Sequence, residues 1–169
     1  DASPGVLGVV VWLGAAVALF TMVYPGMVLG SMRSVPFWSG AMPVLLLLSA
    51  APLSGAAIVT IIGGAVDIGI NLRQLSLWLL VAYGVMLFAH VAMGVQGTPA
   101  ERAAARQLIA GNLSYVFWVG MTLVGVVLPL ALLAWDAWAS DPLVARMGAV
   151  LVLAGGLLMR YGIVASGVK

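Results

Sequence analysis

The sequence predicts an all-α integral membrane protein, a helical bundle with about five transmembrane helices and one short interfacial helix. Of its residues 64% are hydrophobic and only 7% are charged, whereas soluble domains are about half apolar. The apolar residues form five long runs, each near the roughly 20 residues that cross a bilayer. Because lipid offers no hydrogen bonds to the backbone, each run must be helical. The runs are continuous and lack the alternation of a transmembrane barrel.

The five predicted spans cover residues 5–29, 41–65, 75–95, 113–135 and 147–166. No basic segment or small-residue cleavage site precedes the first run, so we interpret it as a span and not as a signal peptide. The chain begins at Asp1, which we interpret as the start of a mature chain or of a fragment. We expect residues 1–169 to form a single bundle.

The second span contains a proline near its middle, Pro52, in addition to Pro43 near its start. A proline at that depth removes one backbone hydrogen bond and clashes with the preceding turn, so we expect a kink. Ser49 or Ser54 can satisfy the freed groups. The kink serves either packing alone or a substrate cavity.

One soluble-type helix is predicted at residues 99–110, between the third and fourth spans. Thr98 and Glu101 have the spacing of a capping box, and a proline occupies the first helical position. Arg102 and Arg106 are four residues apart and share one face. We expect this helix to lie at the membrane surface, where its basic face contacts anionic lipid headgroups or a partner subunit.

The distribution of basic residues predicts the orientation, because Lys and Arg concentrate in cytoplasmic loops. Five spans place the two termini on opposite sides. The side that holds the C-terminus carries Arg33, Arg102, Arg106 and Lys169, and the other carries Arg73 and Arg146, together with Asp1, Asp67, Asp136 and Asp141. We therefore expect a multi-pass protein of the inner (cytoplasmic) membrane with a cytoplasmic C-terminus.

Several chemistries are excluded by composition. The chain has no cysteine and a single histidine, His90, so it offers no ligand set for an iron–sulfur cluster, a disulfide or a haem with two axial histidines. It also lacks a phosphate-binding loop, a nucleophile elbow and a metalloprotease motif. We expect no metal-held or covalent cofactor in this chain, no catalytic residues of a self-contained enzyme and no nucleic-acid partner.

Polar residues at membrane depth are the candidates for function, because burying them is costly. His90 lies roughly 22 Å along the third span and Arg160 roughly 20 Å along the fifth, so both belong to the cytoplasmic half and can line one proton or quinone pathway. Alternatively, Arg160 snorkels to the headgroups and His90 is a neutral core residue. Three tyrosines are quinone-carbonyl donors or interfacial anchors: Tyr24, Tyr83 and Tyr161.

A second polar group lies at the outer end of the second and third spans. Asp67 and Arg73 flank this turn, near Asn71 and Gln74. A quinone headgroup pocket or a proton mouth needs such a mixture, because quinone carbonyls accept hydrogen bonds and their reduction consumes protons. An interfacial ion pair explains the same residues.

Several segments resemble the NrfD-like family of membrane subunits, which includes the polysulfide reductase anchor. The likeness covers most of the chain and lies in these segments: Tyr24-Pro25-Gly26-Met27-Val28-Leu29; Arg33; Pro36-Phe37-Trp38; Pro43; Leu45 to Ala50; Gly55; Gly111; Phe117-Trp118; Gly125; Pro129; and Gly155-Gly156-Leu157-Leu158-Met159-Arg160-Tyr161.

The resemblance implies a cofactor-free bundle that binds quinone or quinol and exchanges electrons with an iron–sulfur subunit, itself connected to a molybdopterin or cytochrome subunit. Members of the family usually have eight or more spans, with the quinone pocket largely in the first bundle. This chain is similar to the later part, which implies that it belongs to a larger membrane subunit. Only Arg160 matches a family pattern, the terminal Gly-Gly-x-x-x-Arg.

We therefore predict a membrane subunit of a quinone-linked oxidoreductase complex, non-catalytic or quinone-reacting, with proton translocation as an additional role. The pathway candidates are His90, Arg160, Asp67, Arg73 and Tyr24. Two alternatives remain open: a purely structural membrane anchor, and half of a secondary transporter, which the proline near mid-membrane favours.

Overall fold

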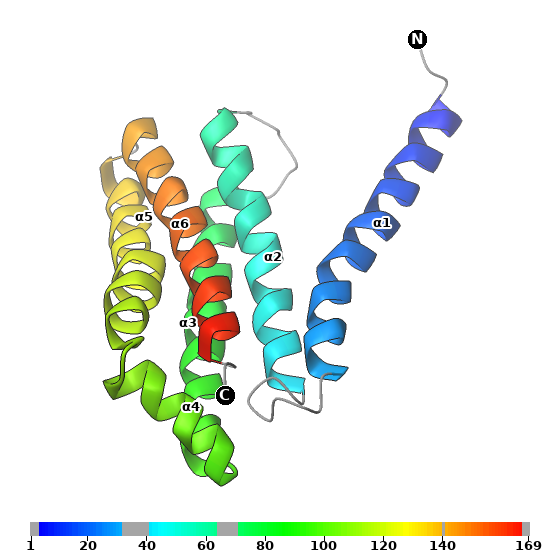
Figure 1. Cartoon of the computed structure of the whole chain (residues 1–169). Coiled ribbons are helices and arrows are strands. Elements are labelled where there is room, and N and C mark those ends of the chain that lie inside the picture. The colour runs from blue at the N-terminus through cyan, green and yellow to red at the C-terminus, as the bar shows by residue number, and fades with distance from the viewer. Residues whose placement is uncertain (1–3, 32–40, 64–70, 140, 167–169) are drawn as a thin grey trace.

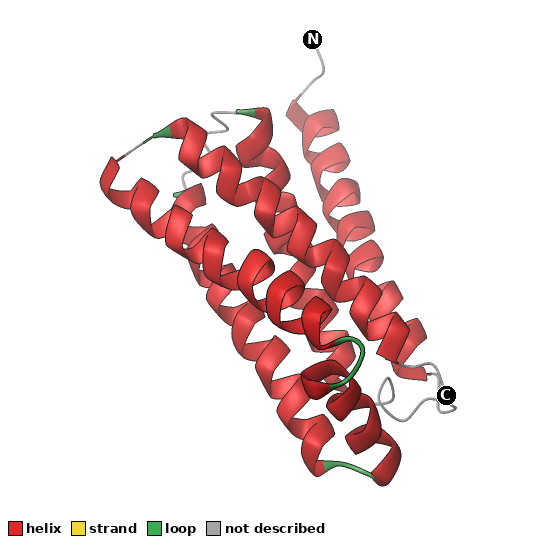
Figure 2. Cartoon of the chain, turned by 60° about the vertical axis from the view of Figure 1, so that its left-hand side comes forward, coloured by secondary structure: helices red, strands yellow, loops and turns green. Residues whose placement is uncertain are grey.

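The computed structural model describes residues 4–31, 41–63, 71–139 and 141–166. This described part is 94% helical and contains no strand (Figure 2). The elements follow in the order α1 (Pro4–Ser31), α2 (Ala41–Ile62), α3 (Leu72–Gln96), α4 (Pro99–Ala110), η1 (Val116–Val127), α5 (Leu128–Ala139) and α6 (Pro142–Ser166). The prediction of an all-α membrane bundle is confirmed.

Among the described residues, five helical stretches are long and apolar enough to cross a membrane: Gly5–Val28, Ala41–Ile62, Leu72–Gln96, Val116–Trp138 and Pro142–Ser166. Both α3 and α6 begin several residues before the predicted spans, because the first turn of α3 is polar and Arg146 separates the apolar first turn of α6 from the rest of its apolar run. The Asn71 side chain accepts a hydrogen bond from the backbone N–H of Gln74 at 3.3 Å, and Asp141 Oδ1 accepts one from the N–H of Leu143 at 2.9 Å. Such caps satisfy backbone donors that hydropathy does not register.

The helices α2, α3, α6 and the continuous η1–α5 span form the bundle, and α1 lies at its edge (Figure 1). Among the described elements α1 contacts only α2. This contact is close near the end of α1, where a Cβ on Gly26 would lie 3.0 Å from Val44 Cα. Further toward its N-terminus α1 leans away from the bundle (Figure 1), and the apolar residues there are exposed, including Trp12 and Phe20.

The core of the bundle depends on a close approach of η1 and α6. A Cβ added to Gly155 would collide with the backbone of Gly125, so the two helices touch through their main chains at this point. Around it, Phe117, Met121 and Met159 are almost fully buried. The glycine pair Gly155-Gly156 therefore serves helix packing, as its small size indicates.

The first half of the fourth span is a π-helix, η1, which the sequence does not predict. Its end is marked by a bond from the N–H of Leu128 to the carbonyl of Leu123, five residues earlier. Pro129, which cannot donate a backbone hydrogen bond, follows directly and is buried in the α-helical half. Wide turns of this kind are rare and usually short.

The short helix α4 has the predicted capping box. Thr98 Oγ1 accepts from the N–H of Glu101 at 3.4 Å, and the Glu101 carboxylate accepts from the N–H of Thr98 at 2.5 Å. Leu108 on α4 is buried against the bundle, whereas Arg102 and Arg106 are exposed. The helix lies across the end of the bundle at which α3 ends (Figure 1), with its basic residues turned outward.

Pro52 lies inside a helix that continues without interruption from Ala41 to Ile62. The two nearby hydroxyls donate to other carbonyls, Ser49 to Leu46 and Ser54 to Ala50, each at 2.8 Å. Neither reaches the carbonyl of residue 48, whose usual partner would be the N–H that proline lacks. The serines therefore do not repair the proline site in the way we expected.

Candidate functional site

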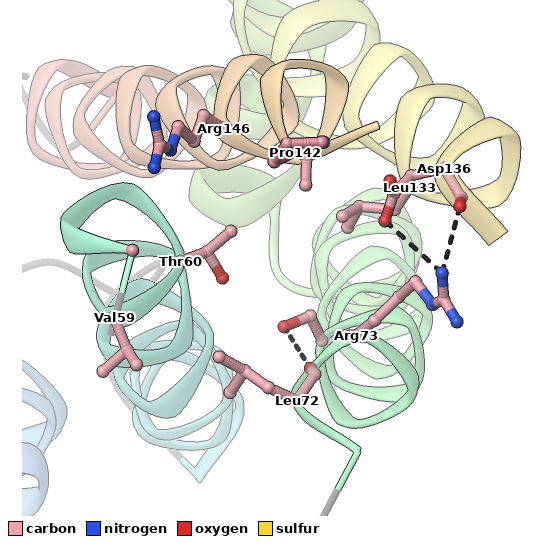
Figure 3. Close-up of a pocket in the computed structure, with 11 residues that line it drawn as sticks. Val59, Thr60, Leu72, Arg73, Leu133, Asp136, Pro142 and Arg146 are labelled. Atoms are coloured by element: carbon pink, nitrogen blue, oxygen red, sulfur yellow. Dashed lines mark hydrogen bonds and ion pairs between the residues drawn. The ribbon is translucent and has the colours of Figure 1, made fainter. Parts of the chain in front are cut away.

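A cavity of about 330 Å³ opens at the end of the bundle where α3 and α6 begin. Four helices, α2, α3, α5 and α6, contribute to its wall (Figure 3). It is lined by Val59, Thr60, Gly63, Leu72, Arg73, Ser76, Leu133, Asp136, Pro142, Ala145 and Arg146. Apolar and polar side chains are mixed in this wall, as in most small-molecule sites.

The strongest polar contact in this wall joins α3 to α5. Arg73 Nη1 donates to the backbone carbonyl of Asp136 at 3.0 Å and lies 3.6 Å from Asp136 Oδ2. Figure 3 shows the guanidinium and the carboxylate facing each other. The Asp136 side chain is 9% exposed and that of Arg73 34%, so this pair is less solvated than an ordinary surface salt bridge.

Two hydroxyls also line the cavity, that of Thr60 on α2 and that of Ser76 on α3. Thr60 donates to the carbonyl of Ala56 at 2.9 Å, and Ser76 donates to that of Leu72 at 2.8 Å. Each hydroxyl proton is therefore engaged within its own helix, while the oxygen keeps lone pairs that can accept a further hydrogen bond. Figure 3 shows Thr60 on the cavity side of α2. Both residues suit a ligand that donates.

A second, smaller cavity lies deeper in the bundle. It shares Thr60, Ser76 and Leu133 with the first and is otherwise lined by Leu53, Ala57, Ala149 and Val152. Its volume of about 10 Å³ is near the minimum that holds one water molecule, and two hydroxyls supply polar partners. The same two hydroxyls thus line both cavities, and the rest of the inner wall is apolar.

Arg146 completes the charged residues of the cavity. It is exposed, and in the described part of the chain it has no ion pair or hydrogen bond. Its Nη2 would lie 2.8 Å from a Cβ on Gly63, a residue with a φ of 71° at the end of α2. Glycine suits this position because it tolerates positive φ and leaves room for the guanidinium.

The predicted candidates do not converge on one site. Arg73 lies at the cavity, but His90 follows it by 17 positions on the same helix, roughly 25 Å further along the axis. His90 is buried at 5% exposure. Arg160, on α6, is exposed and lies within electrostatic range of the Tyr83 hydroxyl. These residues belong to the opposite half of the bundle from Arg73.

The remaining two candidates lie elsewhere. Tyr24 is on α1, 57% exposed, with its ring stacked on Phe20 at a centroid distance of 5.8 Å. Because α1 contacts only α2 among the described elements, nothing described brings Tyr24 near the cavity. Asp67 lies outside the described residues, and the partner that the structure gives Arg73 is Asp136.

Two polar residues in the interior were underestimated by sequence reasoning. Asp136 counted only as an outer acidic residue, although it is buried. Tyr83 was left as either a quinone-carbonyl donor or an interfacial anchor, and the anchor alternative is wrong because Tyr83 is 2% exposed; its hydroxyl has no hydrogen-bond partner among the described residues. Its spacing of seven from Ser76 and from His90 places all three on one helical face, and this spacing was the available signal.

The described residues form five membrane-length helices, four of which line the cavity, and this arrangement defines the class: a multi-pass α-helical membrane protein. A family model described as polysulfide reductase, of the NrfD type, matches residues 4–169. The chain belongs to this family, so it is a membrane subunit of a redox complex that works with other subunits. Among curated proteins and solved structures, none matches the chain.

Proposed function

We propose that this subunit exchanges electrons between a membrane quinone or quinol and an iron–sulfur partner subunit, and that the quinone headgroup occupies the 330 Å³ cavity. The observation that best supports this proposal is the mixture of donors, acceptors and apolar side chains in the cavity wall. The Arg73 guanidinium is a donor for a quinone carbonyl, and the oxygens of Thr60 and Ser76 are acceptors for a quinol hydroxyl. Leu72 and Leu133 provide apolar surface for the ring.

The composition of the chain supports a partner that carries the redox centres. No cysteine and one histidine leave no ligand set for a cluster or a di-histidine haem. Electrons from a bound quinol must therefore pass to another subunit, which we propose to be an iron–sulfur protein connected to a molybdopterin or cytochrome subunit.

We further propose the inner membrane as the location, with the cavity on the outer side and the C-terminus in the cytoplasm. This orientation follows from the uneven distribution of Arg and Lys between the two sides.

Quinone binding to the intact complex tests this proposal. Arg73→Gln removes the guanidinium and should raise the Kd of a soluble quinone analogue about tenfold or more, as expected for losing a hydrogen bond to a charged group. Arg102→Gln is the matched control, because Arg102 lies on α4 at the other end of the bundle and bonds to the carbonyl of Gly97. Unchanged binding in Arg73→Gln would contradict this site and favour a structural anchor.

Proton translocation is a second function, favoured by one observation. Ser76, Tyr83 and His90 repeat every seven residues along the buried face of α3, and Ser76 also lines both cavities. This stripe extends over about 21 Å of helix. In complex reconstituted into vesicles, Tyr83→Phe should abolish quinol-driven proton movement while electron transfer continues. The exposed Tyr115→Phe is the control, and equal proton movement in both variants would exclude the route.

A further inference from the structure

We propose that Asp136 is the residue that accepts and returns the quinol protons in this cavity. The inference rests on the proposed quinone function and adds to it a specific acid–base group. Asp136 lies near the end of α5 and lines the cavity with its side chain 9% exposed. Asp67, the acidic residue that the sequence suggested beside Arg73, lies outside the described residues.

The other polar groups of the cavity cannot take up a proton near neutral pH. Arg73 and Arg146 remain protonated, because arginine does not lose its proton in proteins. The hydroxyls of Thr60 and Ser76 accept hydrogen bonds but are far too weak as bases to become protonated. Among the described residues that line the cavity, Asp136 is the one carboxylate, and no histidine is present.

The geometry of the ion pair leaves the carboxylate available. The nearer contact of Arg73 Nη1, at 3.0 Å, is with the backbone carbonyl of Asp136, whereas the carboxylate oxygen Oδ2 is 3.6 Å away. The guanidinium thus holds α5 in place through the main chain. In the described part of the chain the carboxylate accepts no hydrogen bond, so its lone pairs are not engaged by a protein donor at hydrogen-bond distance.

The proton step follows from this arrangement. When quinol is oxidised, each of its two O–H bonds breaks, and two electrons pass one at a time to the iron–sulfur partner. Each proton moves to an Asp136 oxygen and then to water at the cavity mouth, which returns the carboxylate to its ionised form before the next transfer. Quinone reduction uses the same steps in reverse. Among the described residues that line the cavity, the charged group beside Asp136 is Arg73 on α3. Arg146 on α6 lies next to Gly63 at the end of α2, and the hydroxyl that α2 contributes is that of Thr60.

The test measures quinol oxidation by the intact complex and, separately, binding of a quinone analogue, each as a function of pH. Asp136→Asn keeps the shape of the side chain and removes the base. It should leave the analogue Kd within about threefold and slow oxidation by at least about 100-fold, as expected for loss of a general base. Asp136→Glu, which restores a carboxylate, should recover much of the rate. Asp141→Asn is the control, because Asp141 caps α6 nearby but does not line the cavity.

Each result separates the two proposals. If Asp136→Asn oxidises quinol with the rate and pH profile of the unchanged complex, Asp136 is not the proton acceptor, although the quinone function survives. If the unchanged complex neither binds nor oxidises quinol, both proposals fail. Should Asp136→Asn fail to assemble, Asp136→Ser, which also removes the base, decides: a slowed oxidation with an unchanged analogue Kd supports the inference, and an unaltered rate and pH profile overturns it.

Discussion

At the residue scale, the polar residues of the site were easier to predict from the sequence than the side chains they contact. Arg73 was a candidate because it belongs to a mixed polar group at the outer turn, but its contact with Asp136 joins residues 63 positions apart. No local pattern encodes such a contact. The seven-residue spacing shows that Tyr83 shares a helical face with two other polar residues. It does not show whether that face is buried, because this depends on which helices pack against it. The unpredicted part of the site is thus the part made by tertiary packing.

Gly155 gives a stability prediction at this scale. Gly155→Ala introduces a methyl group that would collide with the Gly125 backbone, so η1 and α6 must separate. We expect a loss of about 1–3 kcal/mol, the usual cost of overpacking, seen as a lower Tm in detergent. Gly14→Ala is the control, because nothing lies within 4 Å of its added Cβ. Equal Tm values for the two variants would show that the glycine contact does not hold the bundle together.

At the scale of the elements, features that depend only on neighbouring residues could be predicted from the sequence. The capping box of α4 uses residues three apart and was predicted from the sequence alone. The spans were found from hydropathy, but the first turns of α3 and α6 were missed because polar residues, Arg73 and Gln74 in α3 and Arg146 in α6, interrupt the apolar run. The π-helical η1 had no such signal, since its register depends on how Gly120 and Gly125 pack against α6.

The cap of α4 can be tested directly. Thr98→Ala removes the acceptor for the N–H of Glu101, at an expected cost of about 0.5–2 kcal/mol to the helix end. Amide hydrogen exchange in the first turn of α4 should accelerate by roughly 2- to 30-fold. Thr21→Ala serves as control, because that hydroxyl bonds within α1. If the first turn of α4 exchanges at the same rate in both, the capping box does not hold the helix start.

At the scale of the whole molecule, composition predicted the class and the number of spans, because lipid imposes helices of fixed length. It did not predict which helices pack together. The isolation of α1 and the cavity between α2, α3, α5 and α6 follow from side chains that meet across the bundle. An apolar helix face can lie against lipid or against another helix at similar cost. The spacing of polar and apolar residues along a span therefore gives little information about which faces pack together.

The orientation of the whole molecule is testable because the chain has no native cysteine. Asp141→Cys places a thiol at the cavity end, and Gln107→Cys places one on the exposed side of α4. The bias of Arg and Lys predicts that a membrane-impermeant maleimide labels the first in intact cells and the second only after permeabilisation. The reverse labelling pattern would place the cavity in the cytoplasm.

The central claim is that this subunit connects a membrane quinone to an iron–sulfur partner. The most direct measurement is to purify the native complex in mild detergent, determine its iron content and co-eluting proteins, and follow the cluster spectrum after anaerobic addition of quinol. We predict a cysteine-rich iron–sulfur protein in the complex and a cluster spectrum that responds to quinol, more slowly with Arg73→Gln. A lone chain without iron, or clusters that do not respond to quinol, would contradict the claim.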